Sequence, residues 1–512
     1  MERRYFTFKR FHLLLIVLTG LMCLLFCVSV VRYLPVVGDN VYPEAAGVVS
    51  AHRLAQGHGL YADYRRSPYI VTAFPPFWYS ALAGAAKLGF SNLDSLTLFG
   101  RIFSLVCLGG MLMLSYFWSR HVGVKRHLAI VAPLLLLSFP VLTPWAIAAR
   151  PDFPGLLLAL AALYCVATRT SRTSVVLGAV LAASAFLTRH NAVAVPTAIV
   201  LWLMWSRKWK RAVAFCAVWG IVVASAFVAV QKASDGLLGL NLSGAKFGSF
   251  ALTYVRDVIG RLLESPGNGF AIVLLALGLL GLLQALRAGD ARMRLATIYF
   301  VVACGFSFLG AAAAGAAVNH LLEPAFALTL MAPLGLERME SSWQDDSPAA
   351  IFAFTLIAVV LLPTLDVQRW NVMHNRPDDL RSFVPIVEKM QVFTDIPYLA
   401  ARASSPEFLD TASLVYAERP GTQAAWSTDL ANAFAQKKYD LIILSAPVEE
   451  LYFKGGHYPR YPHLDSAVEA AISKNYVLCT ASGAVYLYGP LTSDSRSSCA
   501  STANVAWMDV GS

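Results

Sequence analysis

The sequence predicts an α-helical membrane protein with many spans and a small C-terminal domain of helices and strands. Hydrophobic residues make up 57% of the chain and charged residues only 14%, and long apolar runs recur as far as Leu365. A bilayer requires about 20 apolar residues per helical span, whereas a soluble core cannot bury so much continuous apolar sequence. Beyond Leu365 polar residues become common and the long runs end. We therefore divide the chain into a membrane domain, 1–365, and a C-terminal domain, 366–512.

Basic residues lie in short clusters between the apolar runs. The formal net charge is +10, which in a soluble protein would suggest nucleic acid as a partner. The clusters fall at 1–10, 120–127, 169–172, 207–211 and 287–294, and this alternation is typical of cytoplasmic loops. We therefore expect the lipid bilayer, and no nucleic acid, as a partner. The first apolar segment runs past Val31 without a small-residue cleavage site, which favours a span with a cytoplasmic N-terminus over a signal peptide.

Placing every basic cluster on the cytoplasmic side predicts about eleven spans. They are 12–34, 99–118, 128–147, 153–168, 174–188, 191–206, 212–231, 269–286, 295–317, 325–337 and 350–365. The apolar stretch 74–90 is short, begins near Pro75 and contains Lys87, so we expect a helix on the outer membrane surface there. A span at 74–90 is the alternative. Eleven spans put the C-terminal domain on the outer side of the membrane.

The C-terminal domain reads as small α/β. Short β-rich segments at 391–394, 439–445, 476–480 and 484–488 alternate with helical patterns at 424–437 and 463–474, which indicates a sheet packed with helices. Cys479 and Cys499 are the two cysteines of this domain. An oxidising compartment would permit a disulfide between them, and the sequence leaves this open.

The unusual polar residues of the membrane domain gather on its predicted outer face. The longer outer segments are 35–98, with its surface helices, and 232–267, and short polar turns occur at 150–152, 189–191 and 319–320. The predicted inner loops carry little except positive charge. We therefore expect any chemistry on the outer side.

Several of these segments resemble the C-type (GT-C) glycosyltransferase superfamily, in the branch of protein O-mannosyltransferases and bacterial lipid A aminoarabinose transferases. The first outer loop reads GDNVYPEAAGVVSAHRLAQGHGLYADYR and continues to FPPFWYSALAGAAKLG, with Arg101 at the start of the returning span. RPDFPGLLLALAALY, LTRHNAVAVP and NHLLEPAFAL resemble later outer turns of that family, and the C-terminal segments resemble the outer domain of its bacterial members. Asp39 is followed by Asn40 instead of the usual Glu, and the Trp-Trp-Asp signature of oligosaccharyltransferases is missing.

The resemblance implies transfer of a monosaccharide from a polyprenyl-phosphate-linked donor to a hydroxyl of a glycolipid, polysaccharide or protein, at the inner (plasma) membrane. Asp39 occupies the place of the family's catalytic Asp and is the expected general base, although it would equally suit a helix N-cap. Asp152, an ionisable residue between two apolar runs, is a second catalytic candidate, unless it pairs with Arg150 at a span end. Glu44 is the third, as the acidic partner or as a charge at a helix N-terminus.

The leaving phosphate requires cationic ligands. Arg189, Arg53 and Arg101 lie on the predicted outer side, and the guanidinium fork suits phosphate oxygens. Interfacial Arg side chains also reach lipid headgroups without any catalytic role. The remaining candidates for substrate contact are His190, Asn319, His320 and Glu323. The histidines show no spacing typical of metal ligands, so we expect no metal and no cofactor.

Two other functions fit a membrane protein of this kind. A secondary transporter would show internal repeats and interrupted helices with polar residues near mid-membrane, and the sequence shows neither clearly. A lipid-linked glycan polymerase or ligase would place its key residues in a late, large outer loop. The early loop that contains Asp39 favours the transferase.

Overall fold

The computed structural model describes residues 2–492, with internal gaps. The gaps are 42–43, 140–141, 170, 245–249, 265–267, 289–290, 314–315, 343–360, 362–363, 366–379, 405, 407, 410–413, 415–424, 449–463, 465 and 483–484. The predicted domain boundary at 366, most of the predicted span 350–365, and Cys499 therefore lie outside the described residues.

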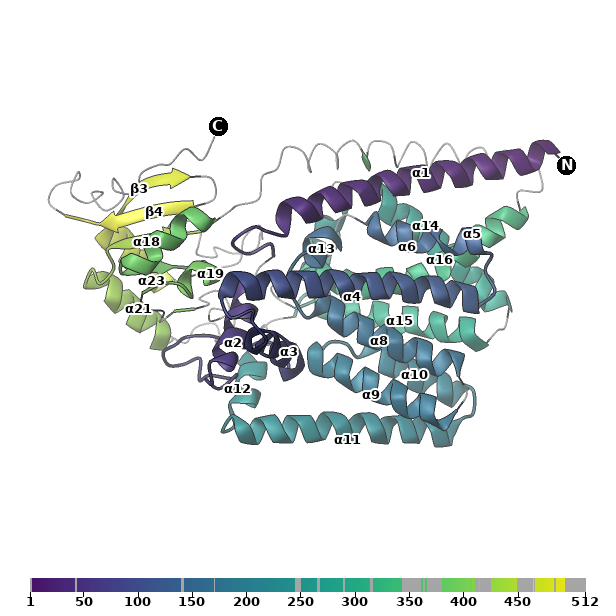
Figure 1. Ribbon diagram of the computed structural model, residues 1–512, viewed down its shortest axis with the longest axis horizontal. Coiled ribbons are helices and arrows are strands. Elements are labelled where there is room, and N and C mark those ends of the chain that lie inside the picture. Colours follow the sequence, from purple (N-terminus) through teal and green to yellow (C-terminus); the bar gives the residue numbers. More distant parts are fainter. Residues whose placement is uncertain are drawn as a thin grey trace.

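Apolar helices of different lengths form a bundle that runs along the longest axis of the molecule (Figure 1). They are α1 (Glu2–Tyr33), α4 (Leu93–His121), α8 (Asp152–Thr168), α9 (Arg172–Thr188), α10 (Ala194–Trp205), α11 (Trp209–Ala233), α14 (Asn268–Ala288), α15 (Ala291–Ala311) and α16 (Leu322–Ser342). Among the described residues, five helices are long and apolar enough to cross a membrane, namely α1, α4, α11, α14 and α15, and shorter apolar helices accompany them. The predicted membrane class is thus supported, whereas a count of about eleven spans is not established.

The predicted span 128–147 is not one helix. It divides into α5 (Arg126–Ala129), α6 (Val131–Leu137) and α7 (Leu142–Ala146). Pro133 and Pro144 lie in the first turns of α6 and α7, where a missing N–H costs little because no helical partner exists for it. Proline is therefore compatible with the first turn of α6 and of α7, but it would interrupt one continuous helix over 128–147.

Segment 35–98, which the sequence predicts to be the first outer loop and which keeps that name below, forms two short helices, α2 (Glu44–Ala55) and α3 (Pro76–Lys87). They lie between the bundle and the C-terminal domain (Figure 1). The 12 residues of α3 reach only about 18 Å, too little to cross a hydrocarbon core of about 30 Å. A helix is present in the stretch 74–90 as expected, and its place on the membrane surface stays a prediction. Trp78, Tyr79 and Leu82 are buried in a cluster with residues of α2 and α4, and Phe77 and Leu88 are exposed.

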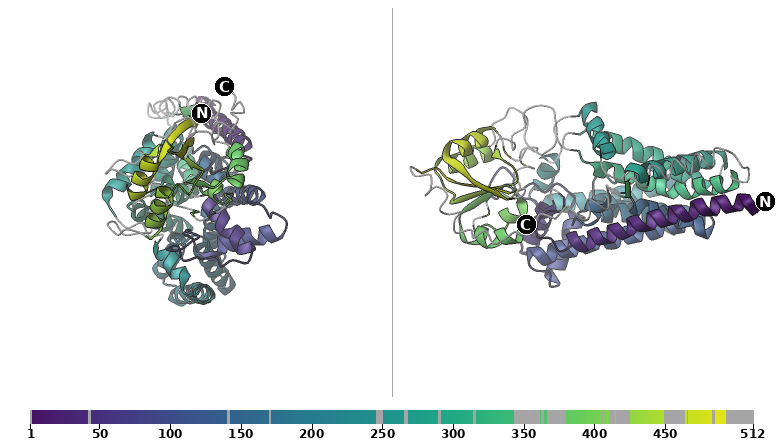
Figure 2. Two further views of the ribbon diagram at one scale, coloured as in Figure 1. Left: turned by 90° about the vertical axis from the view of Figure 1, so that its left-hand side faces the viewer. Right: turned by 90° about the horizontal axis from the view of Figure 1, so that it is seen from above.

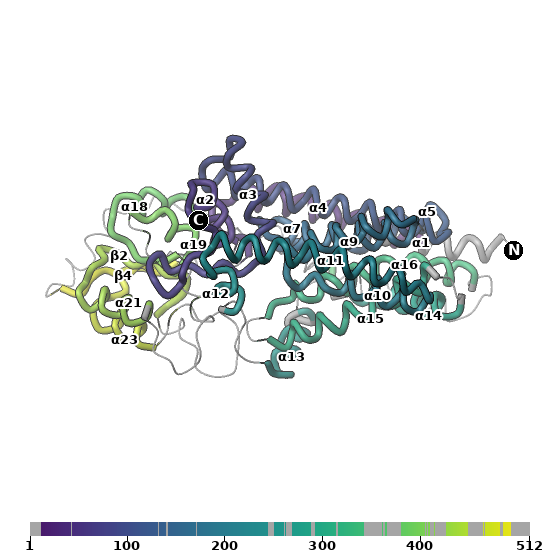
Figure 3. The backbone as a smooth tube through the Cα atoms, turned by 90° about the horizontal axis from the view of Figure 1, so that it is seen from below, coloured from purple at the N-terminus to yellow at the C-terminus, as the bar shows by residue number. Residues whose placement is uncertain are grey.

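The second outer segment contains α12 (Leu237–Gly244) and α13 (Leu252–Glu264), and the short helix η1 (Val318–Leu321) precedes α16. Figure 3 shows α12 next to the C-terminal domain and α13 on another side of the bundle. Buried Asn241 of α12 connects the two outer segments, because its Oδ1 accepts from Thr72 N at 2.8 Å and its Nδ2 donates to the Ala62 carbonyl at 2.8 Å.

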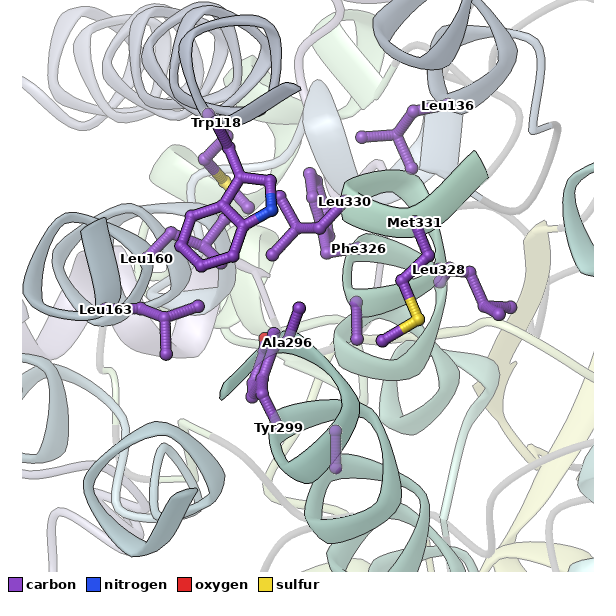
Figure 4. Close-up of a cluster of buried hydrophobic side chains, with 14 of the residues drawn as sticks. Trp118, Leu136, Leu160, Leu163, Ala296, Tyr299, Phe326, Leu328, Leu330 and Met331 are labelled. Carbon is purple, nitrogen blue, oxygen red and sulfur yellow. The ribbon is translucent and has the colours of Figure 1, made fainter. Parts of the chain in front are cut away.

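The bundle core combines residues of early helices, α4 and α8, with residues of late helices, α15 and α16. Figure 4 shows Trp118 of α4 and Leu160 and Leu163 of α8 in one buried cluster with Tyr299 of α15 and Met331 of α16. Aligned glycines allow α14 and α16 to cross closely: a Cβ at Gly281 would overlap the Met331 carbonyl, and a Cβ at Gly335 would overlap the Leu277 carbonyl. Small residues at such a crossing bring two helix backbones into contact.

The C-terminal domain is the predicted sheet with helices. Strands β1 (Val392–Thr394), β2 (Leu441–Leu444), β3 (Tyr476–Ser482) and β4 (Val485–Pro490) form one sheet in the order β1-β2-β4-β3. β1 and β2 are parallel and the other neighbours antiparallel. The helical elements are η2 (Leu380–Phe383), α18 (Val384–Lys389), α19 (Pro397–Ala400), α21 (Ala425–Ala435) and α23 (Ser466–Asn475). The four predicted strands and two predicted helices are confirmed, and Cys479 on β3 is disulfide-bonded.

The C-terminal domain packs against the first outer loop at the end of the bundle opposite the start of α1 (Figure 2). Tyr69 of the loop stacks on Phe408 with ring centroids 4.7 Å apart, and its hydroxyl donates to Asp429. Tyr64 and Val71 enter the same buried cluster. The loop and the domain therefore share one apolar core.

Candidate active site

Asp39 lies in the turn between α1 and α2 and is partly buried. Its Oδ1 accepts a hydrogen bond from the backbone N–H of Ala45 at 2.6 Å. Ala45 is the second residue of α2, so Asp39 satisfies one of the amides that a helix start leaves without an intrahelical partner. The capping contact that the sequence suggested is present, and it holds the Asp39 carboxylate in a defined place.

Glu44 and Arg101 form a buried ion pair beside this turn, with 0% and 1% of their side chains exposed. Arg101 Nε donates to Glu44 Oε1 at 2.7 Å and Nη2 donates to Oε2 at 2.8 Å. Glu44 also accepts from the backbone N–H of Ala149 and of Asn40. The geometry favours a positioning role for both residues over proton transfer or phosphate binding.

Asp152 is the centre of a second buried cluster, at the start of α8. Arg150 Nε lies 3.0 Å from Asp152 Oδ2, and Arg189 Nη2 lies 3.3 Å from Oδ1. Asn319 donates to Oδ1 at 3.1 Å. These side chains come from three turns far apart in the sequence, and the two guanidinium groups outnumber the one carboxylate that they share.

A cavity of about 250 Å³ opens beside this second cluster. Arg189, His320 and Glu323 line its polar part, and Phe250, Phe306 and Leu309 line its apolar part. Glu323 accepts from the Tyr299 hydroxyl at 3.5 Å. Burial, and next Arg189, lower the pKa of His320 in the η1 turn to about 4, although Asp152 opposes the shift. A histidine with this pKa is neutral near pH 7.

Four residues connect the two clusters. Asn40 Nδ2 donates to the Ile147 carbonyl at 2.8 Å, the Ala149 N–H donates to Glu44 at 2.6 Å, and the Arg150 side chain reaches Asp152. Arg150 also lies over the Trp145 ring at 4.8 Å. The segment 147–150 therefore fixes the turn that carries Asp39 relative to the Asp152 cluster.

The structure brings together eight of the ten residues predicted from the sequence, in these two connected clusters and on the wall of the cavity. They are Asp39, Glu44, Arg101, Asp152, Arg189, Asn319 and, on the cavity wall, His320 and Glu323. His190 lies 6.1 Å from the Phe74 ring, and Arg53 lies farther along α2, where burial lowers its pKa. Within the described residues, no group of three or more His, Cys, Asp or Glu is placed to hold a metal.

Sequence reasoning named Arg150 only as a possible ion-pair partner of Asp152 at a span end, and it missed Tyr299. The pair is present, with Arg150 Nε 3.0 Å from Asp152 Oδ2. Tyr299 stands inside a long apolar run of α15 and looks like an ordinary core residue. Only the packing of α15 against α16 shows that its hydroxyl faces Glu323.

Comparison with known proteins identifies the fold through structure alone, because no family model and no curated protein matches the chain. ArnT from Cupriavidus metallidurans, solved with undecaprenyl phosphate, matches with a TM-score of 0.59 and 12% identity, over 93% of this chain and 98% of ArnT. The archaeal oligosaccharyltransferase AglB from Archaeoglobus fulgidus, solved with an inhibitory peptide and a dolichol-phosphate, matches with a TM-score of 0.53 and 9% identity, over 93% of this chain and 74% of AglB. The chain therefore has the fold of the C-type membrane glycosyltransferases, the superfamily that its outer-loop motifs resemble.

Proposed function

We propose that this protein transfers a monosaccharide from a polyprenyl-phosphate-linked donor to a hydroxyl group of a glycolipid, polysaccharide or protein. The reaction takes place on the outer face of the inner (plasma) membrane, where the C-terminal domain lies, and the N-terminus is cytoplasmic. The fold supports this proposal, since ArnT and AglB were solved with undecaprenyl phosphate and a dolichol-phosphate.

The observation that carries the proposal is the two-sided cavity beside Asp152. Arg189 and the neutral His320 line its polar part, where a phosphate group finds a cation and hydrogen-bonding partners. Its apolar part includes Leu309 and Phe250, which are 58% and 73% exposed on the surface of the molecule. A charged headgroup with a long hydrocarbon tail has this same division. The cavity therefore suits the phosphate end of a lipid carrier.

In the proposed reaction, Asp39 acts on the acceptor and the Asp152 cluster acts on the leaving phosphate. Asp39 takes the proton of the acceptor hydroxyl as that oxygen attacks the anomeric carbon. The bond from the anomeric carbon to the phosphate oxygen breaks, and its electron pair leaves with the polyprenyl phosphate. Arg189 stabilises the negative charge on the phosphate. Asp152, surrounded by Arg150, Arg189 and Asn319, orients Arg189 and takes no proton.

The test is transfer by the purified protein in liposomes that contain a panel of polyprenyl-phosphate sugars and a membrane extract as acceptor source. Release of free polyprenyl phosphate is measured for wild type, Asp39→Asn and Asp63→Asn. Asp63 is a carboxylate of the same outer loop that pairs with exposed Arg65, so it is the matched control.

We expect release by wild type and Asp63→Asn, and a loss of about 10²- to 10⁴-fold in Asp39→Asn, the range typical of a removed general base. Full activity of Asp39→Asn would exclude Asp39 as the base while leaving the reaction in place. Absence of release by wild type from every donor, with an extract that supports ArnT in parallel, would contradict the proposed function.

A further inference from the structure

Every backbone carbonyl from Tyr33 to Gly38, the segment that leads from α1 to Asp39, accepts a hydrogen bond. Arg101 Nη1 donates to the carbonyls of Tyr33, Leu34 and Val36 at 3.4, 3.0 and 2.6 Å, and Nη2 donates to that of Gly38 at 2.6 Å. The two remaining carbonyls of this segment, those of Pro35 and Val37, accept hydrogen bonds from the C-terminal domain. Leu380 N–H donates to the Val37 carbonyl at 2.8 Å, and Arg381 donates to the Pro35 carbonyl at 3.4 Å.

The five N–H groups of Arg101 are fully used in this arrangement. One edge of the guanidinium meets both oxygens of Glu44, and the other donors meet the backbone. Glu44 in turn is fixed by the Ala149 N–H at 2.6 Å. A planar guanidinium with five donors in fixed directions holds several acceptors in one geometry, and a lysine ammonium does not.

We infer that Arg101 is a positioning residue that sets the place of the Asp39 carboxylate, and that the C-terminal domain completes this function through Leu380 and Arg381. Asp39 is the residue directly after Gly38, the last carbonyl that Arg101 binds. The inference rests on the proposed function, in which Asp39 is the general base. A catalytic group displaced by about 1 Å loses about 10²-fold in rate, so the backbone path from Tyr33 to Gly38 controls the reaction.

The first test is Arg101→Lys, which keeps the buried positive charge opposite Glu44. We expect kcat to fall about 10²-fold while the KM for the lipid-linked donor changes less than about 2-fold, because Arg101 does not line the cavity beside Arg189. Hydrogen–deuterium exchange of the peptide that contains Asn40 and Ala45 should accelerate, since their N–H groups are bonded to Glu44 and Asp39. Exchange in α8 and α9 should stay unchanged.

Three results of this first test would overturn the inference. They are unchanged exchange at Asn40 and Ala45, a raised KM with an intact kcat, and lost protection throughout α8 and α9. The last of these would mean that Arg101 serves folding alone.

The second test uses the contact from the C-terminal domain and does not disturb the buried pair. Arg381→Gln removes the side-chain donor to Pro35, and Arg402→Gln is its matched control. Arg402 also joins the domain to the membrane part, at 2.8 Å from Asp94, and its other ion-pair partner is Glu388, at 3.3 Å. We expect kcat to fall about 5-fold in Arg381→Gln and faster exchange at Ala45. Equal kcat and equal exchange at Ala45 in the two variants would overturn the inference. This test remains valid if Arg101→Lys does not fold.

Failure of the proposed function gives a different result. Wild-type protein without any transfer activity would contradict the transferase, whereas the exchange measurements still decide whether Arg101 and Arg381 hold the turn. An active wild type with unchanged kcat in both variants would contradict the positioning role alone.

Discussion

The buried carboxylate of Asp152 holds three polar side chains together in this fold. The Asp152 side chain is 1% exposed, accepts hydrogen bonds from Arg150 and Asn319, and forms an ion pair with Arg189. Removing one partner of a buried ionic group leaves the others desolvated and unpaired, which costs far more than breaking an exposed pair.

Replacement of Asp152 by Asn is expected to lower the free energy of unfolding by about 3–5 kcal/mol, because two buried arginines, Arg150 and Arg189, lose the carboxylate that they share. Asp63→Asn, at the exposed pair with Arg65, is the control and is expected to cost less than about 1 kcal/mol. Denaturation of the purified variants in detergent measures the difference. Equal stability of the two variants would contradict the ionic account of this cluster.

At the scale of helices, the crossing of α14 and α16 depends on glycines. Gly281 and Gly335 each face a backbone carbonyl of the other helix, so neither position has room for a side chain. This crossing holds α16, which begins at Leu322 and carries Glu323 to the cavity. The position of the cavity wall therefore depends on two residues that have no side chain.

Gly281→Ala is expected to lower the free energy of unfolding by at least about 1–3 kcal/mol, the usual cost of overpacking, since a backbone oxygen cannot rotate away. Gly305→Ala in α15 is the matched control: nothing lies within 4 Å of a Cβ there, and alanine is the better helix former. Thermal unfolding in detergent distinguishes them. A stable Gly281→Ala variant would show that the two helices separate without penalty.

For the molecule as a whole, the C-terminal domain belongs structurally to the first outer loop. Tyr69 stacks on Phe408, the Leu409 N–H donates to the Tyr69 carbonyl at 3.1 Å, and the Tyr398 hydroxyl donates to Asp94 at the start of α4. These contacts join the sheet domain to the loop on both sides of α3. The domain is therefore placed to influence the turn that carries Asp39.

Tyr69→Ala is expected to accelerate hydrogen–deuterium exchange at Leu409 by about 5-fold or more, because the apolar contact that shields this amide is lost. Tyr69→Phe keeps the stacking and loses only the bond to Asp429, so its exchange should stay closer to wild type. Exchange in α8 serves as the reference for an intact bundle. Wild-type protection of Leu409 in the alanine variant would mean that Tyr69 does not hold the domain.

Features that depend on local pattern could be predicted without the structure. Apolar runs predicted the bundle helices, the stretch 74–90 predicted the short helix α3, and alternating segments predicted the strands of the C-terminal domain. Each of these elements buries apolar side chains at a regular spacing along the chain. Motif order in the predicted outer loops also predicted the fold, which ArnT and AglB share. Local pattern was insufficient at 128–147, where prolines divide one apolar run into three helices.

Contacts between polar residues far apart in the chain depend on how the helices pack. Arg101 and Glu44 are 57 positions apart, and Asn319 and Asp152 are 167 apart, so no periodicity connects them. The sequence offered Arg101 as a phosphate ligand because a lone interfacial Arg and a fully bonded Arg look identical in one dimension. The difference is physical: a buried donor must find an acceptor, and which acceptor lies within reach depends on how the helices pack.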